Sequence, residues 1–227
     1  MSNNSFAAHP IHFLSTIKQV EKDFTLSFSR YFYRPNSALD ERVVIHVKLS
    51  EVTEPWLERQ LRGLPPGWEL AFNSVIVDSR SRTHHVGMID FKGRPDIAVV
   101  RERAAKLLSP EISRSIIFYD SGRSYHGYIP FLLTPGKWRK FLARLLLINF
   151  VDEPEIIDSR WVGHRLLGGY CALRWSYNSD FHQHAPKLLE TPPNIRRRRE
   201  VNDNSESRQE ELFHNGIGQL RTTGDRP

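Results

Sequence analysis

Residues 115–133 read SIIFYDSGRSYHGYIPFLL, two apolar and β-branched runs on either side of a short polar turn. Residues 115–119 and 125–133 are each typical of a buried β-strand, because β-branched and aromatic side chains pack well on a pleated surface. The segment Asp120–Arg123 contains the aspartate, serine and glycine that tight turns favour. We therefore predict a β-hairpin at this position.

The turn of this hairpin and the start of its second strand carry side chains that bind phosphate groups. Gly122 lets the backbone approach an anion closely, and the hydroxyls of Ser121 and Ser124 can donate hydrogen bonds. Arg123 can contact two phosphate oxygens, and His126 can add a charge-assisted hydrogen bond. The motif predicts a phosphate-binding site, although an ordinary Ser-Gly turn with an outward arginine and a hydrogen-bonded, half-buried histidine has the same sequence.

Strand-like and helix-like segments alternate on both sides of this hairpin. Before it, we expect a strand at residues 42–49, a second hairpin with strands at 68–78 and 83–91, and a helix at 95–108. After it, we expect a helix at 135–150, a short helical piece containing His164 and Arg165, and a final strand at 170–175. This alternation predicts an α+β domain whose central, mostly antiparallel sheet is flanked by helices.

Composition divides the chain into three parts. Residues 1–34 are expected to form an N-terminal helical and extended segment, residues 35–185 the α+β domain, and residues 186–227 a flexible, arginine-rich tail. The tail contains a Thr-Pro-Pro sequence and four consecutive arginines, Arg196–Arg199. Such polar, charged sequence buries too little apolar surface to fold alone, so we interpret it as a solvated linker whose arginines can also contact phosphates.

The composition also excludes several classes of protein. Cys171 is the single cysteine of the 227 residues, which excludes an intramolecular disulfide and a cysteine-rich zinc site, and its apolar strand predicts a buried thiol. The longest apolar run, residues 145–151, is far shorter than the roughly 20 residues that span a membrane. We expect a cytoplasmic protein, and its net charge of +6 favours polyanions such as nucleic acids as partners.

The order of these motifs resembles that of the archaeo-eukaryotic primase superfamily, which includes replicative primases and primase-polymerases. The matching pieces are a strand with Asp90, a helix, the hairpin SGRSYH at 121–126, a second helix, and Asp158 followed by a strand with Arg174. The resemblance covers roughly residues 68–180. It implies a domain of the primase-polymerase fold that transfers nucleotides to the end of a DNA or RNA strand.

The resemblance also implies roles for individual residues. Asp90 and Asp158 would be catalytic ligands of Mg²⁺ or Mn²⁺, because hard cations prefer carboxylate oxygens. A nucleoside triphosphate would be bound by Ser121, Gly122, Arg123, Ser124, His126, Arg174 and Ser176. Arg165 and Lys92 would contact the nucleic acid. A helicase, or another replication or defence protein on a separate chain, is a further partner that the resemblance implies.

The chain departs from the family pattern in its first acidic motif. Strand periodicity places Met88, Asp90 and Lys92 on one face, where the family has two carboxylates. The missing acid therefore corresponds either to Met88 or to Lys92. A hairpin centred between residues 81 and 82 would place Asn73 opposite Asp90, and Asn73 is a poor metal ligand.

Three interpretations of the function follow from this departure. The first is a primase-like nucleotidyltransferase for primer synthesis or extension. The second is a catalytically reduced module that binds nucleotide or nucleic acid without turnover, and the third is an α/β domain whose resemblance is accidental. The histidines do not have the spacing of a metal site, and the tryptophans that we consider for base stacking are Trp161 and Trp175.

Overall fold

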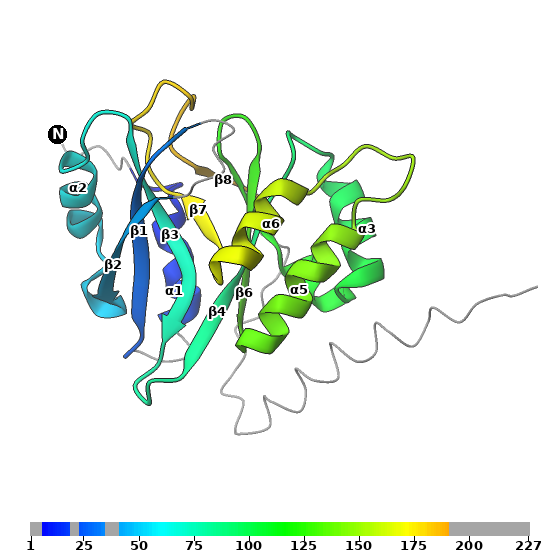
Figure 1. The fold of residues 1–227 in the computed structure, drawn as a ribbon, viewed down its shortest axis with the longest axis horizontal. Coiled ribbons are helices and arrows are strands. Elements are labelled where there is room, and N and C mark those ends of the chain that lie inside the picture. The colour runs from blue at the N-terminus through cyan, green and yellow to red at the C-terminus, as the bar shows by residue number, and fades with distance from the viewer. Residues whose placement is uncertain (1–5, 19–22, 35–40, 191–227) are drawn as a thin grey trace, which may run out of the picture.

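The computed structural model describes residues 6–18, 23–34 and 41–190, which fold around one eight-stranded sheet (Figure 1). The strands are β1 (Thr25–Phe32), β2 (Arg42–Lys48), β3 (Trp68–Val77), β4 (Thr83–Asp90), β5 (Ile117–Asp120), β6 (Tyr125–Leu133), β7 (Ala172–Arg174) and β8 (Lys187–Glu190). They lie in the order β2-β1-β3-β4-β6-β5-β8, with β7 paired to β3, and all pairs among the described strands are antiparallel. The predicted α+β class is confirmed.

Helices cover both faces of this sheet. They are α1 (Leu14–Lys18), α2 (Glu54–Arg62), α3 (Ile97–Leu107), α4 (Pro110–Ser115), α5 (Pro135–Leu147) and α6 (Ser159–Gly168), with 3-10 turns η1 (Pro10–Phe13) and η2 (Leu49–Glu51). Figure 1 shows α5 and α6 in front of the sheet and α1 behind it. Within the described ranges, no helix combines the length and the apolar character that crossing a membrane requires.

Side-chain caps determine where several of these helices begin. The carboxylate of Asp96 accepts a hydrogen bond from the amide of Ala98, so α3 begins at Ile97 and not at Pro95 as the sequence had suggested. The hydroxyl of Thr134 caps α5 in the same way. These caps satisfy amides that have no partner inside the helix, and they are readable from sequence to within one or two residues.

The strands β3 and β4 begin as a hairpin and then diverge. They pair only from Val75 to Val77, and beyond that point β3 pairs with β7 while β4 pairs with β6. Asp90 therefore lies opposite His126 on β6, and the predicted pairing with Asn73 is wrong because β7 occupies that edge of β3. The carboxylate of Asp78 stays at the hairpin turn, where it accepts hydrogen bonds from the backbone and side chain of Arg82.

Both ends of the described chain contribute strands to this sheet. β1 comes from the segment that we predicted to precede the domain, and it lies between β2 and β3. β8 is formed by the first residues of the predicted tail and pairs with β5, because residues 187–190 return to that edge. The amide of Leu188 also donates to the carbonyl of Ala8. The rest of the predicted tail, residues 191–227, lies outside the described residues.

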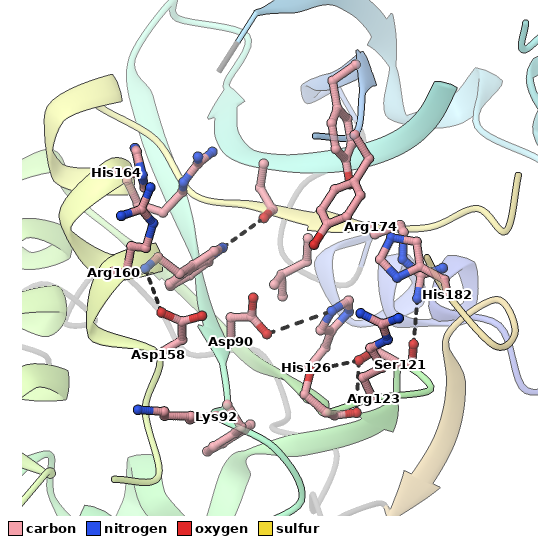
Figure 2. Close-up of a pocket in the computed structure, with 18 of the residues that line it drawn as sticks. Asp90, Lys92, Ser121, Arg123, His126, Asp158, Arg160, His164, Arg174 and His182 are labelled. Carbon is pink, nitrogen blue, oxygen red and sulfur yellow. Dashed lines mark hydrogen bonds and ion pairs between the residues drawn. The ribbon is translucent and has the colours of Figure 1, made fainter. Parts of the chain in front are cut away.

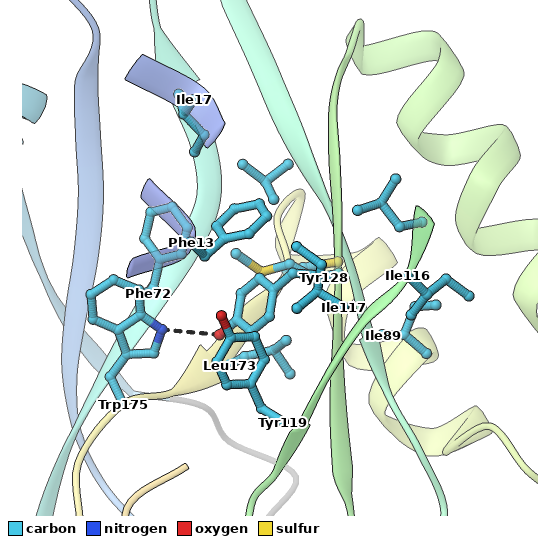
Figure 3. Close-up of a cluster of buried hydrophobic side chains, with 14 of the residues drawn as sticks. Phe13, Ile17, Phe72, Ile89, Ile116, Ile117, Tyr119, Tyr128, Leu173 and Trp175 are labelled. Carbon is cyan, nitrogen blue, oxygen red and sulfur yellow. Dashed lines mark hydrogen bonds between the residues drawn. The ribbon is translucent and has the colours of Figure 1, made fainter. Parts of the chain in front are cut away.

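The core behind the sheet is aromatic (Figure 3). Trp175 is fully buried and its indole Nε1 donates a 2.9 Å hydrogen bond to the hydroxyl of Tyr128, whose ring packs against Phe13. The interpretation of Trp175 as a base-stacking residue is therefore wrong, since a fully buried ring is unavailable to a ligand. The buried thiol predicted for Cys171 is confirmed, and burial raises its pKa to about 12.

Candidate functional site

A cavity of about 410 Å³ opens where the ends of several strands meet the start of α6 (Figure 2). Its size falls within the range of nucleotide and cofactor pockets. The predicted residues that line it are Asp90, Lys92, Ser121, Arg123, Ser124, His126, Asp158, Arg165 and Arg174. The structure therefore gathers nine of the eleven predicted residues around one cavity; Gly122 and Ser176 lie outside its lining.

The two acidic residues meet through their backbones. The amide of Asp158 donates a 3.1 Å hydrogen bond to the carbonyl of Asp90, and the next residues form an antiparallel bridge between Phe91 and Ile157. The pKa of Asp90 is raised to about 7, first by burial and then by the negative charge of Asp158. The pair thus concentrates negative charge that a cation would stabilise.

Asp158 is held by the helix that it begins. Its Oδ1 accepts a 2.9 Å hydrogen bond from the amide of Trp161 and so caps α6. The indole Nε1 of Trp161 donates to the carbonyl of Ala172 in β7, which fixes the start of α6 against the sheet. This carboxylate is consequently preorganised at the cavity wall.

His126 faces Asp90 from the neighbouring strand. Its Nε2 lies 4.0 Å from Oδ1 of Asp90, and its buried Nδ1 has no hydrogen-bond partner among the described residues. Burial, with the positive charge of Arg174 nearby, lowers the pKa of His126 well below its usual value. The imidazole is therefore neutral near pH 7, and a neutral ring would offer a ligand an ordinary hydrogen bond where we expected a charge-assisted one.

The hairpin turn uses part of its polar groups internally. The hydroxyl of Ser121 donates to the carbonyl of Ser124, and the amide of Gly122 donates to the carboxylate of Asp120. Gly122 has a φ of +101°, and a Cβ there would lie 3.3 Å from the amide nitrogen of Gln183. Gly122 is needed for the turn and for this close packing. We had predicted that its backbone would be open to an anion in the cavity, but Gly122 is not among the lining residues.

Arg174 holds the turn in place and is not a free phosphate ligand. It is buried, and its guanidinium donates to the carbonyls of Ser121 at 2.5 Å and His184 at 3.2 Å, and to that of Ser176. Burial lowers the pKa of Arg174, although an arginine remains charged at neutral pH. Arg123, by contrast, lines the cavity and is exposed to solvent.

Ser176 is directed away from the cavity by a buried carboxylate that sequence reasoning missed. Its hydroxyl donates to Glu69, which is fully buried and also accepts hydrogen bonds from the hydroxyl of Ser179 and the amide of Asn178. Glu69 thus anchors residues 176–179 to β3. The available signal was a single carboxylate inside the apolar strand WELAFNSVIV, because a buried charge needs several hydrogen-bond partners.

We expect Glu69→Ala to lower the free energy of unfolding by about 2–4 kcal/mol, because it leaves buried hydroxyl and amide donors without a partner. Urea unfolding measures this change. Glu58, which pairs with Arg62 on the surface, gives the matched control, and Glu58→Ala should change stability by no more than about 0.5 kcal/mol. Equal losses for both variants would contradict the anchoring role.

Met88 and Lys92, the two positions at which the family's second acid could be missing, have different surroundings. Lys92 lines the cavity, and its ammonium donates to Glu155, which is not among the lining residues. Met88 is fully buried and lies opposite Tyr128, inside the core. Of the two positions that the sequence left open, only that of Lys92 faces the cavity.

Positive charge dominates the cavity lining. Its arginines and lysine are Arg34, Arg42, Lys92, Arg123, Arg160, Arg165 and Arg174, while its acids are Glu41, Asp90 and Asp158. This balance suits a polyanionic ligand. Sequence reasoning missed Arg34, Arg42 and Arg160, because no local motif connects the end of β1, the start of β2 or the start of α6 with the hairpin.

Comparison with known proteins agrees with this geometry. A family model described as archaeo-eukaryotic primase 1D-like matches residues 48–187, which are 140 of the 227 residues. No curated protein matches the sequence. The matched region includes both acids, the hairpin and α6, and the chain therefore belongs to the archaeo-eukaryotic primase-like family of the 1D-like type.

Proposed function

We propose that the cavity binds a nucleoside triphosphate together with one Mg²⁺ or Mn²⁺ ion, as the nucleotide site of a primase-like nucleotidyltransferase that uses a DNA or RNA strand. The observation that carries this proposal is the backbone-linked pair of Asp90 and Asp158 inside a cavity whose other charges are mainly positive. The acids suit a divalent cation, and the arginines suit phosphate oxygens.

The donor set fits one ion better than two. Asp90 and Asp158 supply carboxylates whose mutual repulsion a cation would relieve, as the raised pKa of Asp90 indicates. Among the described residues, no group of three or more histidine, cysteine or acidic side chains is arranged around a common metal position. When bound, the ion would supply positive charge that stabilises a phosphoryl group undergoing transfer.

The remaining residues of the cavity would bind and orient the triphosphate. Arg123 is exposed to solvent at the turn and can pair with phosphate oxygens. The neutral His126 can donate or accept one hydrogen bond, and Arg174 keeps the turn at the required position through the carbonyl of Ser121. Arg165 adds positive charge to the cavity from α6.

Lys92 favours a second candidate function, a primase-like module that binds nucleotide or nucleic acid without turnover. Lys92 lines the cavity at one of the two positions where the family pattern has a carboxylate, and its ammonium donates to Glu155. Primer extension with the wild type and Asp90→Ala separates the two functions. If the wild type extends the primer and Asp90→Ala does not, the protein is an enzyme. If the wild type binds triphosphate but extends no primer, the protein is a binding module.

The nucleotide site itself is tested by thermal unfolding with each nucleoside triphosphate and Mn²⁺ or Mg²⁺. Ligand at about 100 times its dissociation constant should stabilise the wild type by about 2.7 kcal/mol. We expect His126→Ala and Arg123→Ala to lose most of this shift in melting temperature. Lys140→Ala, an exposed change on α5 outside the cavity lining, should keep it. No shift of the wild type with any triphosphate would contradict the proposal.

A further inference from the structure

Aromatic rings gather at one side of the cavity, partly from residues that precede the family match. We define the aromatic wall as Tyr31 at the end of β1 and Tyr33 just after it, with Phe181 and His182 from the segment after β7. Tyr31, Tyr33 and His182 line the cavity directly, and the centroid of the Tyr33 ring lies 5.2 Å from that of Phe181 and 4.9 Å from that of His182. Figure 2 shows His182 on the same side of the cavity as Ser121 and Arg123, away from Asp158 and Arg160.

Parts of the aromatic wall are exposed to solvent. Phe181 is 39% exposed, whereas the core rings of β1 and β3, Phe28 and Phe72, are fully buried. An exposed ring beside a cavity, packed against two further rings, offers apolar surface that a flat ligand could cover. The wall therefore has the character of a binding surface.

The charges around the wall select a polyanion. The guanidinium of Arg42 lies 4.1 Å from the centroid of the Tyr31 ring, and Arg34 follows Tyr33 in the chain. Arg34 and Arg42 line the same cavity, and Glu41 is the lining acid closest to them along the chain. Arginines beside aromatic rings are the combination that single-stranded nucleic acids bind, with bases on the rings and phosphates on the cations.

His182 contributes an aromatic ring rather than a charge. Burial, with Arg174 and Arg123 nearby, lowers the pKa of His182 to about 3, so its imidazole is neutral near pH 7. Its Nε2 is buried and has no hydrogen-bond partner among the described residues. A base that stacks at the wall could supply that partner through its polar edge.

We propose that the aromatic wall stacks the unpaired bases of a single-stranded nucleic acid that enters the nucleotide cavity. The role of this strand in nucleotide transfer rests on the function proposed above, but the stacking is carried by the rings and arginines alone. Stacking tolerates any base, because every base has a flat aromatic face. The wall would thus hold a strand without selecting its sequence, and β1 would be part of the strand-binding site.

The test compares two labelled oligonucleotides of equal length, a thymidine oligomer and an abasic oligomer with the same phosphates. Fluorescence anisotropy on the full chain measures both affinities. Stacking of one base contributes about 1–3 kcal/mol, so the wild type should bind the thymidine oligomer at least about fivefold more tightly than the abasic one. Tyr33→Leu and Phe181→Ala should remove most of this preference while leaving abasic binding unchanged, and Tyr33→Phe should retain it.

The control is Tyr177→Ala, because Tyr177 is 55% exposed in the same segment and lies outside the cavity lining. It should keep the wild-type preference. Equal wild-type affinity for both oligomers would overturn the proposal and leave binding by phosphate contacts alone. A preference that survives both Tyr33→Leu and Phe181→Ala would also overturn it, because the bases would then stack elsewhere.

Triphosphate-dependent melting shifts on the same variants separate the two proposals. A wild type that prefers the thymidine oligomer but shows no shift with triphosphate and metal would retain the aromatic wall and exclude the proposed nucleotide site. A wild type that shows the melting shift with triphosphate and metal but binds both oligomers equally would support the nucleotide site and exclude the aromatic wall as a stacking site. Melting temperatures without ligand show whether each variant is folded, and Phe181→Ala, at an exposed ring, provides the test if Tyr33→Leu is unfolded.

Discussion

Asp90→Asn should stabilise the ligand-free protein near neutral pH and at the same time abolish its stabilisation by divalent cations. The pKa of Asp90 is raised from 3.8 to about 7, so the folded state binds this proton more tightly than the unfolded state does. The resulting stability is complete below pH 4 and is lost as pH rises through 7. Each pKa unit corresponds to about 1.4 kcal/mol, so the loss amounts to a few kcal/mol, which the uncharged asparagine avoids.

Thermal unfolding between about pH 4 and pH 8, with and without Mn²⁺, measures both effects. The difference in melting temperature between Asp90→Asn and the wild type should grow with pH in the absence of metal, and Mn²⁺ should shrink the pH dependence of the wild type. Asp152→Asn, at an exposed turn, is the matched control and should follow the wild type. If the melting temperature of Asp90→Asn depended on pH in the same way as that of the wild type, the carboxylates of Asp90 and Asp158 would not be coupled as described.

Restoring an acid should give opposite results at the two positions of the incomplete acidic motif. Lys92→Asp adds a carboxylate to the cavity lining and removes a competing positive charge, so we expect Mn²⁺ affinity to rise by about tenfold or more. Met88→Asp buries a carboxylate opposite Tyr128 in the core and should lower the free energy of unfolding by about 3–5 kcal/mol. Electron paramagnetic resonance of free Mn²⁺ and urea unfolding give the two quantities.

Two further substitutions separate charge from packing in this experiment. Lys92→Ala removes the ammonium without adding a ligand, and we expect a smaller gain in Mn²⁺ affinity than for Lys92→Asp. Met88→Leu conserves volume and should cost less than about 1.5 kcal/mol. If neither Lys92→Asp nor Lys92→Ala changes the affinity for Mn²⁺, position 92 is not part of the metal site.

The predicted hairpin and helices came from patterns that are local in the chain. Tyr125–Leu133 is rich in aromatic and apolar residues, and Thr134 followed by Pro135 marks the beginning of α5. The grouping of Asp90, the hairpin and Asp158 could also be anticipated, because their order resembles a known family. The resemblance also assigned Ser176 to the nucleotide site. That assignment could not be corrected from the sequence, because nothing near Ser176 reveals that Glu69, 107 residues earlier, accepts its hydrogen bond.

The arrangement of β7 shows why register could not be predicted. A hairpin turn specifies pairing only near itself, and the sequence suggested that β3 and β4 stay together as far as Asp90. In the structure β7 takes the edge of β3 at Asn73, and Asp90 pairs with His126. The competition between two strands for one edge depends on packing over the whole sheet, which no window of sequence contains.

Local sequence was thus sufficient for most of the elements and for the fold class, since periodicity, turn residues and caps act over a few positions. The hairpin motif and the family resemblance together supplied nine of the residues that line the cavity. Tertiary packing alone brings Tyr31 and Arg42 to the cavity, buries Met88 while Lys92 lines the cavity, and joins the backbones of Asp90 and Asp158. These relations join residues far apart in the chain. Their energies come from burial and from electrostatic interactions across the folded sheet, and these arise only once the strands have paired.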